Sequence, residues 1–173
     1  MSKEPTPLPP SKYKKLLEAA EKRSSRHGFT VYALGHTGLR GSEFSRLSCE
    51  WLDSEKQMLQ VPADAVKGIR SRVRSIPLSE DGVERFKEFF TTRSEVAITH
   101  STVTKQVKSI SEDTLSENVS PQTLRSTFAM RLLQIGVPQS EIRQLLGYTP
   151  SKWDIVPADS YGVAEKKIRS GLY

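Results

Sequence analysis

Short helical segments that end at glycine constrain the fold of this chain most strongly. Ser11 is suited to cap a helix over residues 12–28, which has one apolar face and would end at Gly28. The next segment, 29–38, is almost wholly apolar and ends at Gly38. Further helical patterns cover 40–52, 80–93, 101–113 with Ser101 or Thr102 as cap, 121–136, 138–147, and a stretch from about Asp159. The sequence therefore predicts a mainly α fold.

One segment breaks this helical pattern. Residues 57–79 alternate apolar and polar side chains on both sides of a middle that Pro and Gly interrupt, which predicts a two-stranded β-hairpin with a long turn. The turn is strongly basic and contains Lys67, Arg70, Arg72 and Arg74. Such a turn can reach a backbone phosphate, or it can be the solvated end of an edge strand that its charge protects from aggregation. The predicted fold class is thus mainly α with a small β-hairpin.

The composition narrows the possible partners. With 26 Lys and Arg against 20 Asp and Glu, the net charge is +6 and the pI is about 9.5, which suits a polyanion but also fits an ordinary basic protein. Cys49 is the single cysteine, and the three histidines lack metal-ligand spacing, so we expect no structural metal. No apolar run approaches a membrane span, and we expect a cytoplasmic protein.

The length of 173 residues fits one domain. The Pro-rich residues 1–10 are expected to form a linker or arm, and residues 11–173 the domain itself. Tyr13 and Tyr32 lie in predicted core helices and are expected to be packed aromatic residues. His36 is expected to be packed and hydrogen-bonded, and His100 to lie in a loop.

Two arginines occupy apolar surroundings. Arg40 lies at the junction of two predicted apolar helices, and Arg125 lies near the start of another. A buried guanidinium needs a carboxylate, carbonyl groups or a bound anion as its partner. Glu43 could form an internal salt bridge with Arg40. Two such arginines could instead converge on one phosphate, because each guanidinium can donate two parallel hydrogen bonds.

The order of these motifs resembles a known family. The segments "ALGHTGLRGSEFSRLSCEWLD", a basic hairpin ending "RSIPLS", "VSPQTLRSTFAMRLLQIGVPQSEIRQLLGY" and a downstream tyrosine resemble the catalytic domain of the tyrosine recombinase (phage integrase) family. The resemblance runs from about Leu8 to Ala164. It implies the tyrosine recombinase catalytic-domain fold and an enzyme that cuts and rejoins DNA at specific sites through a 3′-phosphotyrosyl intermediate, without a cofactor.

The resemblance assigns roles residue by residue. Arg40 and Arg125 would clamp the scissile phosphate, with Glu43 supporting Arg40. Lys67 would be the general acid for the leaving 5′-hydroxyl, although the turn is about two residues longer than usual and Arg70 or Arg72 could compete for this role. Tyr161 best matches the nucleophile among the five tyrosines; Tyr173, the last residue, is expected to be frayed.

Two positions depart from the family pattern. Gln122 occupies the place of a histidine; it can hydrogen-bond a phosphate oxygen or the attacking tyrosine but cannot exchange a proton near pH 7. Tyr148 occupies the place of a histidine or tryptophan and is expected to flank the phosphate. These departures keep open the alternative of a catalytically impaired recombinase-fold protein that only binds DNA. A helix-turn-helix regulator built on the segment around Arg143 is a further alternative.

The resemblance also implies partners. Double-stranded DNA would be held by phosphate contacts, for which Arg70, Arg72, Lys105 and Lys108 are candidates. The residues after Tyr161 resemble a tail that docks onto a neighbouring copy, so self-association on DNA is expected. The family usually carries an upstream helical domain for which this chain has no room. A nucleoid-associated location is expected.

Overall fold

The computed structural model describes residues 5–62, 74–147 and 162–173. These residues form two compact units. The first, called the helical unit, comprises Met1–Leu47, Val96–Met130 and Tyr173; the second, called the mixed unit, comprises Ser48–Glu95 and Arg131–Leu172.

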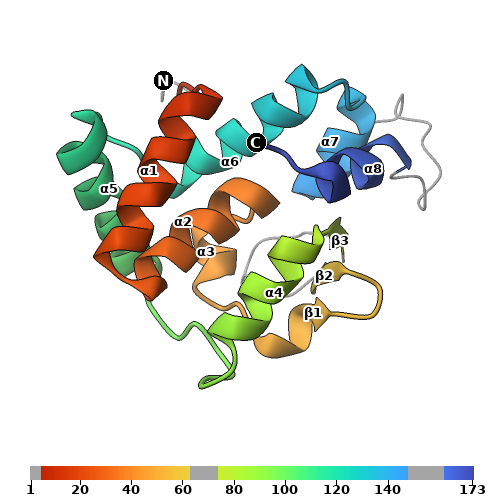
Figure 1. Ribbon diagram of the computed structural model, residues 1–173, viewed down its shortest axis with the longest axis horizontal. Coiled ribbons are helices and arrows are strands. Elements are labelled where there is room, and N and C mark those ends of the chain that lie inside the picture. The colour runs from red at the N-terminus through yellow and green to blue at the C-terminus, as the bar shows by residue number, and fades with distance from the viewer. Residues whose placement is uncertain (1–4, 63–73, 148–161) are drawn as a thin grey trace. The chain divides into compact units, whose positions relative to one another are not determined.

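The helical unit is built from the helices α1 (Pro10–Arg23), α2 (Ser25–Thr37), α3 (Gly41–Phe44), α5 (His100–Leu115) and α6 (Pro121–Gln134) up to Met130. Helix α1 packs against both α2 and α5 (Figure 1). The side chains between these helices are almost fully buried and include Tyr13, Leu16, Leu34, Phe44, Val103, Val107, Leu124 and Phe128. These contacts supply the apolar burial that holds short helices together in water.

The first helix boundary differs from the sequence prediction. Helix α1 begins at Pro10, before Ser11, and ends at Arg23. Helix α2 then begins at Ser25, because the hydroxyl of Ser24 accepts a hydrogen bond from the backbone N–H of His27 at 3.0 Å. Gly28 therefore does not end a helix. It lies inside α2, where an added Cβ would approach Cγ of Glu21 to 2.8 Å, so glycine permits the close packing of α1 and α2.

The predicted helix over residues 40–52 was also wrong. Helix α3 ends at Phe44. Further along the chain, Ser48 pairs with Glu95 in an isolated antiparallel β-bridge, and the 3₁₀ turn η1 (Cys49–Trp51) of the mixed unit follows. The serine hydroxyls of this segment bond to nearby backbone groups, Ser45 to the carbonyl of Ser42 and Ser48 to the N–H of Glu50. Such local bonds compete with the regular helical pattern.

The predicted hairpin is confirmed and gains a third strand. Strands β1 (Leu52–Asp53), β2 (Met58–Val61) and β3 (Arg74–Pro77) form an antiparallel three-stranded sheet in the order β1-β2-β3, with Leu59 opposite Ile76. Arg74, expected in the basic turn, instead begins β3. It is only 3% exposed, and its Nε donates a hydrogen bond of 2.9 Å to the carbonyl of Leu145.

The remaining helices of the mixed unit are α4 (Glu80–Phe89), α7 (Gln139–Leu146) and α8 (Gly162–Ser170). Helices α7 and α8 both contact β3, and they contact each other. In the helical unit, α5 is capped by Thr99, not by Ser101 or Thr102. The predicted fold class, mainly α with a small sheet, is confirmed. Among the described residues, no helix is long and apolar enough to cross a membrane.

Candidate functional site

Arg40 is placed by the end of α2 and the start of α3. Gly38 ends α2 with a φ of 70°, a left-handed conformation that glycine adopts without strain. The backbone N–H of Arg40 donates to Oε1 of Glu43 at 2.8 Å, whereas its guanidinium Nη1 lies 3.5 Å from Oε2. Glu43 is 1% exposed and the Arg40 side chain 24% exposed. The buried carboxylate thus fixes the main chain of Arg40 and leaves part of its guanidinium open to solvent.

Arg125 is held against the same segment. Its side chain is 2% exposed, and Nη1 donates a hydrogen bond of 2.6 Å to the carbonyl of Gly38. The end of a helix carries partial negative charge on its carbonyl groups, so this position suits a cation. The bond ties α6 to the backbone two residues before Arg40. The structure therefore brings the two sequence-predicted arginines to one segment of the chain.

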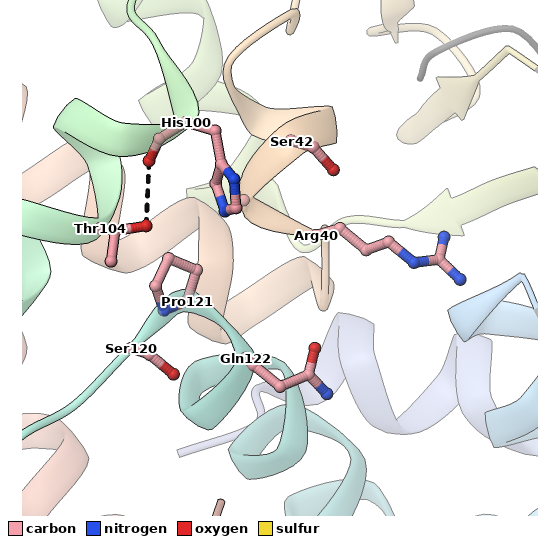
Figure 2. Close-up of a pocket in the computed structure, with 8 residues that line it drawn as sticks. Arg40, Ser42, His100, Thr104, Ser120, Pro121 and Gln122 are labelled. Carbon is pink, nitrogen blue, oxygen red and sulfur yellow. Dashed lines mark hydrogen bonds between the residues drawn. The ribbon is translucent and has the colours of Figure 1, made fainter. Parts of the chain in front are cut away.

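A pocket of about 380 Å³ opens beside this segment in the helical unit (Figure 2). Its lining residues are Arg40, Gly41, Ser42, His100, Thr104, Ser120, Pro121 and Gln122. Figure 2 shows the side chains of Arg40 and Gln122 extending on the same side of the pocket. A Cβ on Gly41 would lie 2.6 Å from Cδ2 of His100 and 3.0 Å from Cβ of Pro121, so a larger residue would crowd both neighbours.

The electrostatics of the pocket favour an anion. Helices α5 and α6 both begin at its wall, at His100 and Pro121. Thr99 caps α5 through the N–H of Thr102 at 3.1 Å, and Ser120 caps α6 through the N–H of Thr123 at 3.2 Å. Helix N-termini carry partial positive charge, which adds to the charge of the Arg40 guanidinium. The exposed Gln122 amide adds a neutral donor.

His100 is a pocket residue that the sequence prediction missed. It was expected in a loop, but it is the first residue of α5 and lies against Gly41. Thr99, a good N-cap residue directly before it, is the sequence signal that could have placed it.

Some of the other predicted site residues lie in the part of the chain that the structure describes, and some do not. Lys105 and Lys108 lie exposed on α5, and Nζ of Lys108 lies 3.9 Å from Oε1 of Glu112. Five predicted residues lie outside the described residues: Lys67, Arg70, Arg72, Tyr148 and Tyr161.

Tyr173 is held in place by contacts within its own chain, so the prediction that this residue is frayed was wrong. Its hydroxyl donates to the carbonyl of Gly35 at 3.1 Å, and its ring centroid lies 4.3 Å from that of Tyr13. The predicted packing of the neighbouring aromatic residues is confirmed: Tyr13 and Tyr32 are buried, and Nδ1 of His36 lies 2.7 Å from the Tyr13 hydroxyl. The last residue of the chain thus completes an aromatic cluster in the helical unit.

Solved structures show which class of protein has this fold. The chain aligns over its full length with 62% of the XerA recombinase structure, at a TM-score of 0.73 and 22% identity. It also aligns over 98% of its length with 58% of the integrase from mycobacterium phage Brujita, at a TM-score of 0.78 and 18% identity. The fold is that of the catalytic domain of tyrosine recombinases.

Sequence comparison gives the family. Residues 7–152 match the phage integrase family, and the chain belongs to it. A tyrosine recombinase of Pseudothermotoga lettingae is 30% identical over 180 aligned residues, which cover 95% of this chain and 61% of the relative. The tyrosine recombinase XerD of Lacticaseibacillus casei is 31% identical over 129 residues, which cover 65% of this chain and 43% of that relative. The chain spans about half the length of these relatives.

Proposed function

We propose that this chain cuts and rejoins double-stranded DNA at specific sites, as the catalytic part of a tyrosine recombinase. The observation that carries the proposal is the arrangement of the helical unit, in which a buried Arg125 and a partly open Arg40 meet one backbone segment beside an anion-favouring pocket. A DNA backbone phosphate is the anion that such a site would take.

In this proposal Arg40 and Arg125 bind the non-bridging oxygens of the scissile phosphate. Their positive charge stabilises the negative charge that develops on the pentacoordinate phosphorus, which is the role of preorganised donors in phosphoryl transfer. Glu43 and the Gly38 carbonyl hold the two arginines in place before DNA binds. The Gln122 amide donates a hydrogen bond to a phosphate oxygen or to the attacking tyrosine, and Tyr148 flanks the phosphate.

The chemical step is a transesterification. The Tyr161 hydroxyl gives its proton to water as its oxygen attacks phosphorus, a 3′-phosphotyrosyl bond forms, and the bond to the 5′ oxygen breaks. Lys67 gives a proton to the leaving 5′ oxygen, with Arg70 and Arg72 as neighbours that contact phosphate. The free 5′-hydroxyl of a partner strand then attacks the phosphotyrosyl bond and restores Tyr161. One phosphodiester is exchanged for another, so no energy source is required.

Affinity for DNA would come from exposed cations beside this site. Lys105 and Lys108 lie on α5, whose first residue His100 lines the pocket. The pair of Lys108 with Glu112 is exposed and weak, so it would yield to a phosphate. Helix α5 is therefore proposed to follow the DNA backbone from the pocket outward.

The second candidate function is DNA binding without cleavage. The favouring observation is the exposed Gln122 at the pocket wall, because an amide can bind phosphate but cannot move a proton there. This alternative shares the phosphate site and differs only in the absence of a covalent product.

Self-association through the residues after Tyr161 is also proposed. In the structure Tyr173 bonds to Gly35 of its own chain, so docking of this residue on a second copy requires that bond to be exchanged. Sedimentation of protein–DNA complexes is expected to show paired copies for the wild type and single copies for Tyr173→Ala. An unchanged stoichiometry in the variant would contradict this mode of pairing.

Covalent trapping on nicked DNA duplexes tests the main proposal. The nick lets the cleaved fragment diffuse away, so that the protein–DNA adduct accumulates and is seen on a denaturing gel. Wild-type protein is expected to form the adduct, Tyr161→Phe to form none, and Arg40→Ala to cleave about a thousandfold more slowly. Arg23→Ala is the matched control, because Arg23 pairs with Asp113 on the surface of the helical unit.

Binding measurements on the same DNA separate the alternatives. Salt-sensitive binding without any adduct on cognate DNA would favour the binding-only function. A helix-turn-helix mode would instead make Arg143→Ala lose binding while Arg40→Ala stays unchanged. Loss of tight binding or of cleavage in Arg40→Ala, with Arg143→Ala near the wild type, is the result that the phosphate clamp predicts.

A further inference from the structure

A buried acid in the mixed unit has no part in the proposed chemistry. Glu141 lies in the first turn of α7 and is only 5% exposed. Glutamate is rarely buried to this extent unless it is paired, because removing a carboxylate from water is unfavourable. The position of this carboxylate therefore requires a specific partner.

The partner is the start of helix α8. Oε1 of Glu141 accepts hydrogen bonds from the backbone N–H groups of Val163 at 3.1 Å and Ala164 at 3.5 Å. These groups belong to the first turn of α8, where N–H donors have no partner within the helix. A negative charge at a helix N-terminus is also favourable. Glu141 thus caps α8 from a different helix.

The second oxygen of this carboxylate is not explained by helix capping. Oε2 of Glu141 is buried and has no hydrogen-bond partner within the part of the chain that the structure describes. A buried acceptor without a donor lowers stability, and an apolar side chain of similar volume would avoid that loss. Among the described residues, helix capping therefore accounts for Oε1 of Glu141 and leaves Oε2 without an explanation.

The capped turn has a particular place in the chain. Helix α8 begins at Gly162, and Tyr161 is the residue before it in the sequence. The body of α8 is anchored, with Ala164 fully buried and Ile168 4% exposed. The first turn of α8 is therefore the anchored segment to which residue 161 is joined by a peptide bond.

We propose that Glu141 is a positioning residue for strand cleavage, whose carboxylate caps the first turn of α8 and so fixes the backbone that follows the nucleophile. This inference rests on the proposed role of Tyr161. Attack on phosphorus needs the reacting atoms in contact and in line, and a displacement of about 1 Å can lower a rate about 100-fold. Hydrogen bonds between Glu141 and the N–H groups of residues 163 and 164 would restrict such a displacement, because these residues follow the nucleophile closely in the chain.

Single-turnover cleavage of nicked DNA, with Kd measured separately, tests the inference. Glu141→Met fills the same space without an acceptor, and its rate constant is expected to fall about 10- to 100-fold while Kd stays within about twofold of the wild type. Glu141→Gln keeps an oxygen that can accept both N–H groups and should recover most of the rate. Glu141→Asp keeps the charge but is too short to reach the N–H groups of residues 163 and 164, so its rate constant should fall as in Glu141→Met. If Glu141→Met does not fold, Glu141→Asp provides the test.

Ser79→Ala is the matched control for a purely structural effect. Ser79 caps α4 in the same unit, through the N–H of Gly82 at 3.0 Å. Its loss should lower the thermal midpoint but leave the cleavage rate constant unchanged. A merely structural Glu141 would behave in the same way, lowering the midpoint or the active fraction with an unchanged rate constant in Glu141→Met and Glu141→Asp. That result would overturn the inference.

The wild type and Tyr161→Phe, run beside these variants, show which proposal fails. A wild type that forms no adduct, or a Tyr161→Phe protein that still forms one, overturns the assignment of Tyr161 and the inference with it. A Tyr161-dependent adduct whose rate does not respond to Glu141 overturns the inference alone.

Discussion

Arg125 combines a structural and a proposed chemical role in one side chain. Its Nη1 bonds to the carbonyl of Gly38, and in the proposed clamp the same guanidinium also donates to a phosphate. Lysine at this position could reach a single acceptor but could not present two parallel donors. The shape of the guanidinium, beyond its charge, is therefore central to the clamp.

The first prediction concerns this shape. Arg125→Lys is expected to lower the cleavage rate constant by about 100-fold or more and the free energy of unfolding by about 1–3 kcal/mol. Single-turnover cleavage and denaturant unfolding measure the two effects. Arg23→Lys, on the surface of the same unit, should change neither. A normal cleavage rate in Arg125→Lys would contradict a two-donor clamp.

His27 should make stability depend on pH. Burial, and then the neighbouring charges of Arg23 and Arg26, lower the pKa of His27 below its ordinary value of 6.5. Between the lowered pKa and 6.5, the unfolded chain binds more protons than the folded chain, so stability rises with pH in this window and levels off above it.

The measurement for this prediction is thermal unfolding across the acidic range. The wild-type midpoint should fall as the pH drops below about 6.5, and His27→Gln should show a smaller fall. A titration of the imidazole by NMR gives the pKa directly. A His27 pKa at or above 6.5 in the folded protein would contradict the prediction.

The sequence predicted which residues lie near one another better than it predicted the groups that they contact. The resemblance to the tyrosine recombinase family predicted a common site for Arg40, Glu43, Gln122 and Arg125, and the structure brings these residues to one unit. The carbonyl that binds Arg125 was not predictable, because a backbone acceptor leaves no trace in residue identity. His100 was missed because its position depends on where α5 begins, and helix boundaries are the least certain part of a sequence prediction.

At the scale of elements, glycines that follow helices differ in their surroundings. Gly147 ends α7 with a φ of 80°, and a Cβ there would lie 2.9 Å from Nη1 of the buried Arg74. Gly136 has a φ of 93°, but a Cβ there would meet nothing within 4 Å. Both glycines relieve backbone strain, and Gly147 also makes room for Arg74.

Alanine substitution separates these two effects. Gly136→Ala should lower the free energy of unfolding by about 1–2 kcal/mol, the left-handed strain of an L-residue. Gly147→Ala should lower it by about 1–3 kcal/mol more, because Arg74 must shift from its bond to Leu145. Denaturant unfolding of the two variants measures the difference. Equal losses would show that Arg74 does not constrain this turn.

The sequence predicted some elements closely. Pro121 and Gly136 bound α6, and Pro138 and Gly147 bound α7, because proline and glycine restrict where a helix can begin or end. Strand β1 was not predicted, since two residues carry no periodicity. The break at Ser24 was missed because a serine can either cap a helix or continue one, and only packing decides between them.

At the scale of the whole molecule, the basic charge should appear in the salt dependence of DNA binding. The logarithm of the binding constant falls with the logarithm of salt concentration by about 0.9 for each phosphate that is neutralised. Lys105→Gln should therefore reduce the slope by about 0.9, as measured by titrations at several salt concentrations. Lys15→Gln, exposed on α1, should leave the slope unchanged. An unchanged slope in Lys105→Gln would place this lysine away from the DNA backbone.

The family fixes the class of chemistry, whereas the activity of this chain is a proposal that one covalent bond can test. The most direct measurement is tandem mass spectrometry of the peptide that remains linked to DNA after cleavage of a nicked duplex and protease digestion. The proposed mechanism predicts a nucleotide attached through phosphate to Tyr161. A nucleotide on Tyr148 or Tyr173, or a chain that binds the cleavable site and never becomes linked to it, would contradict the account.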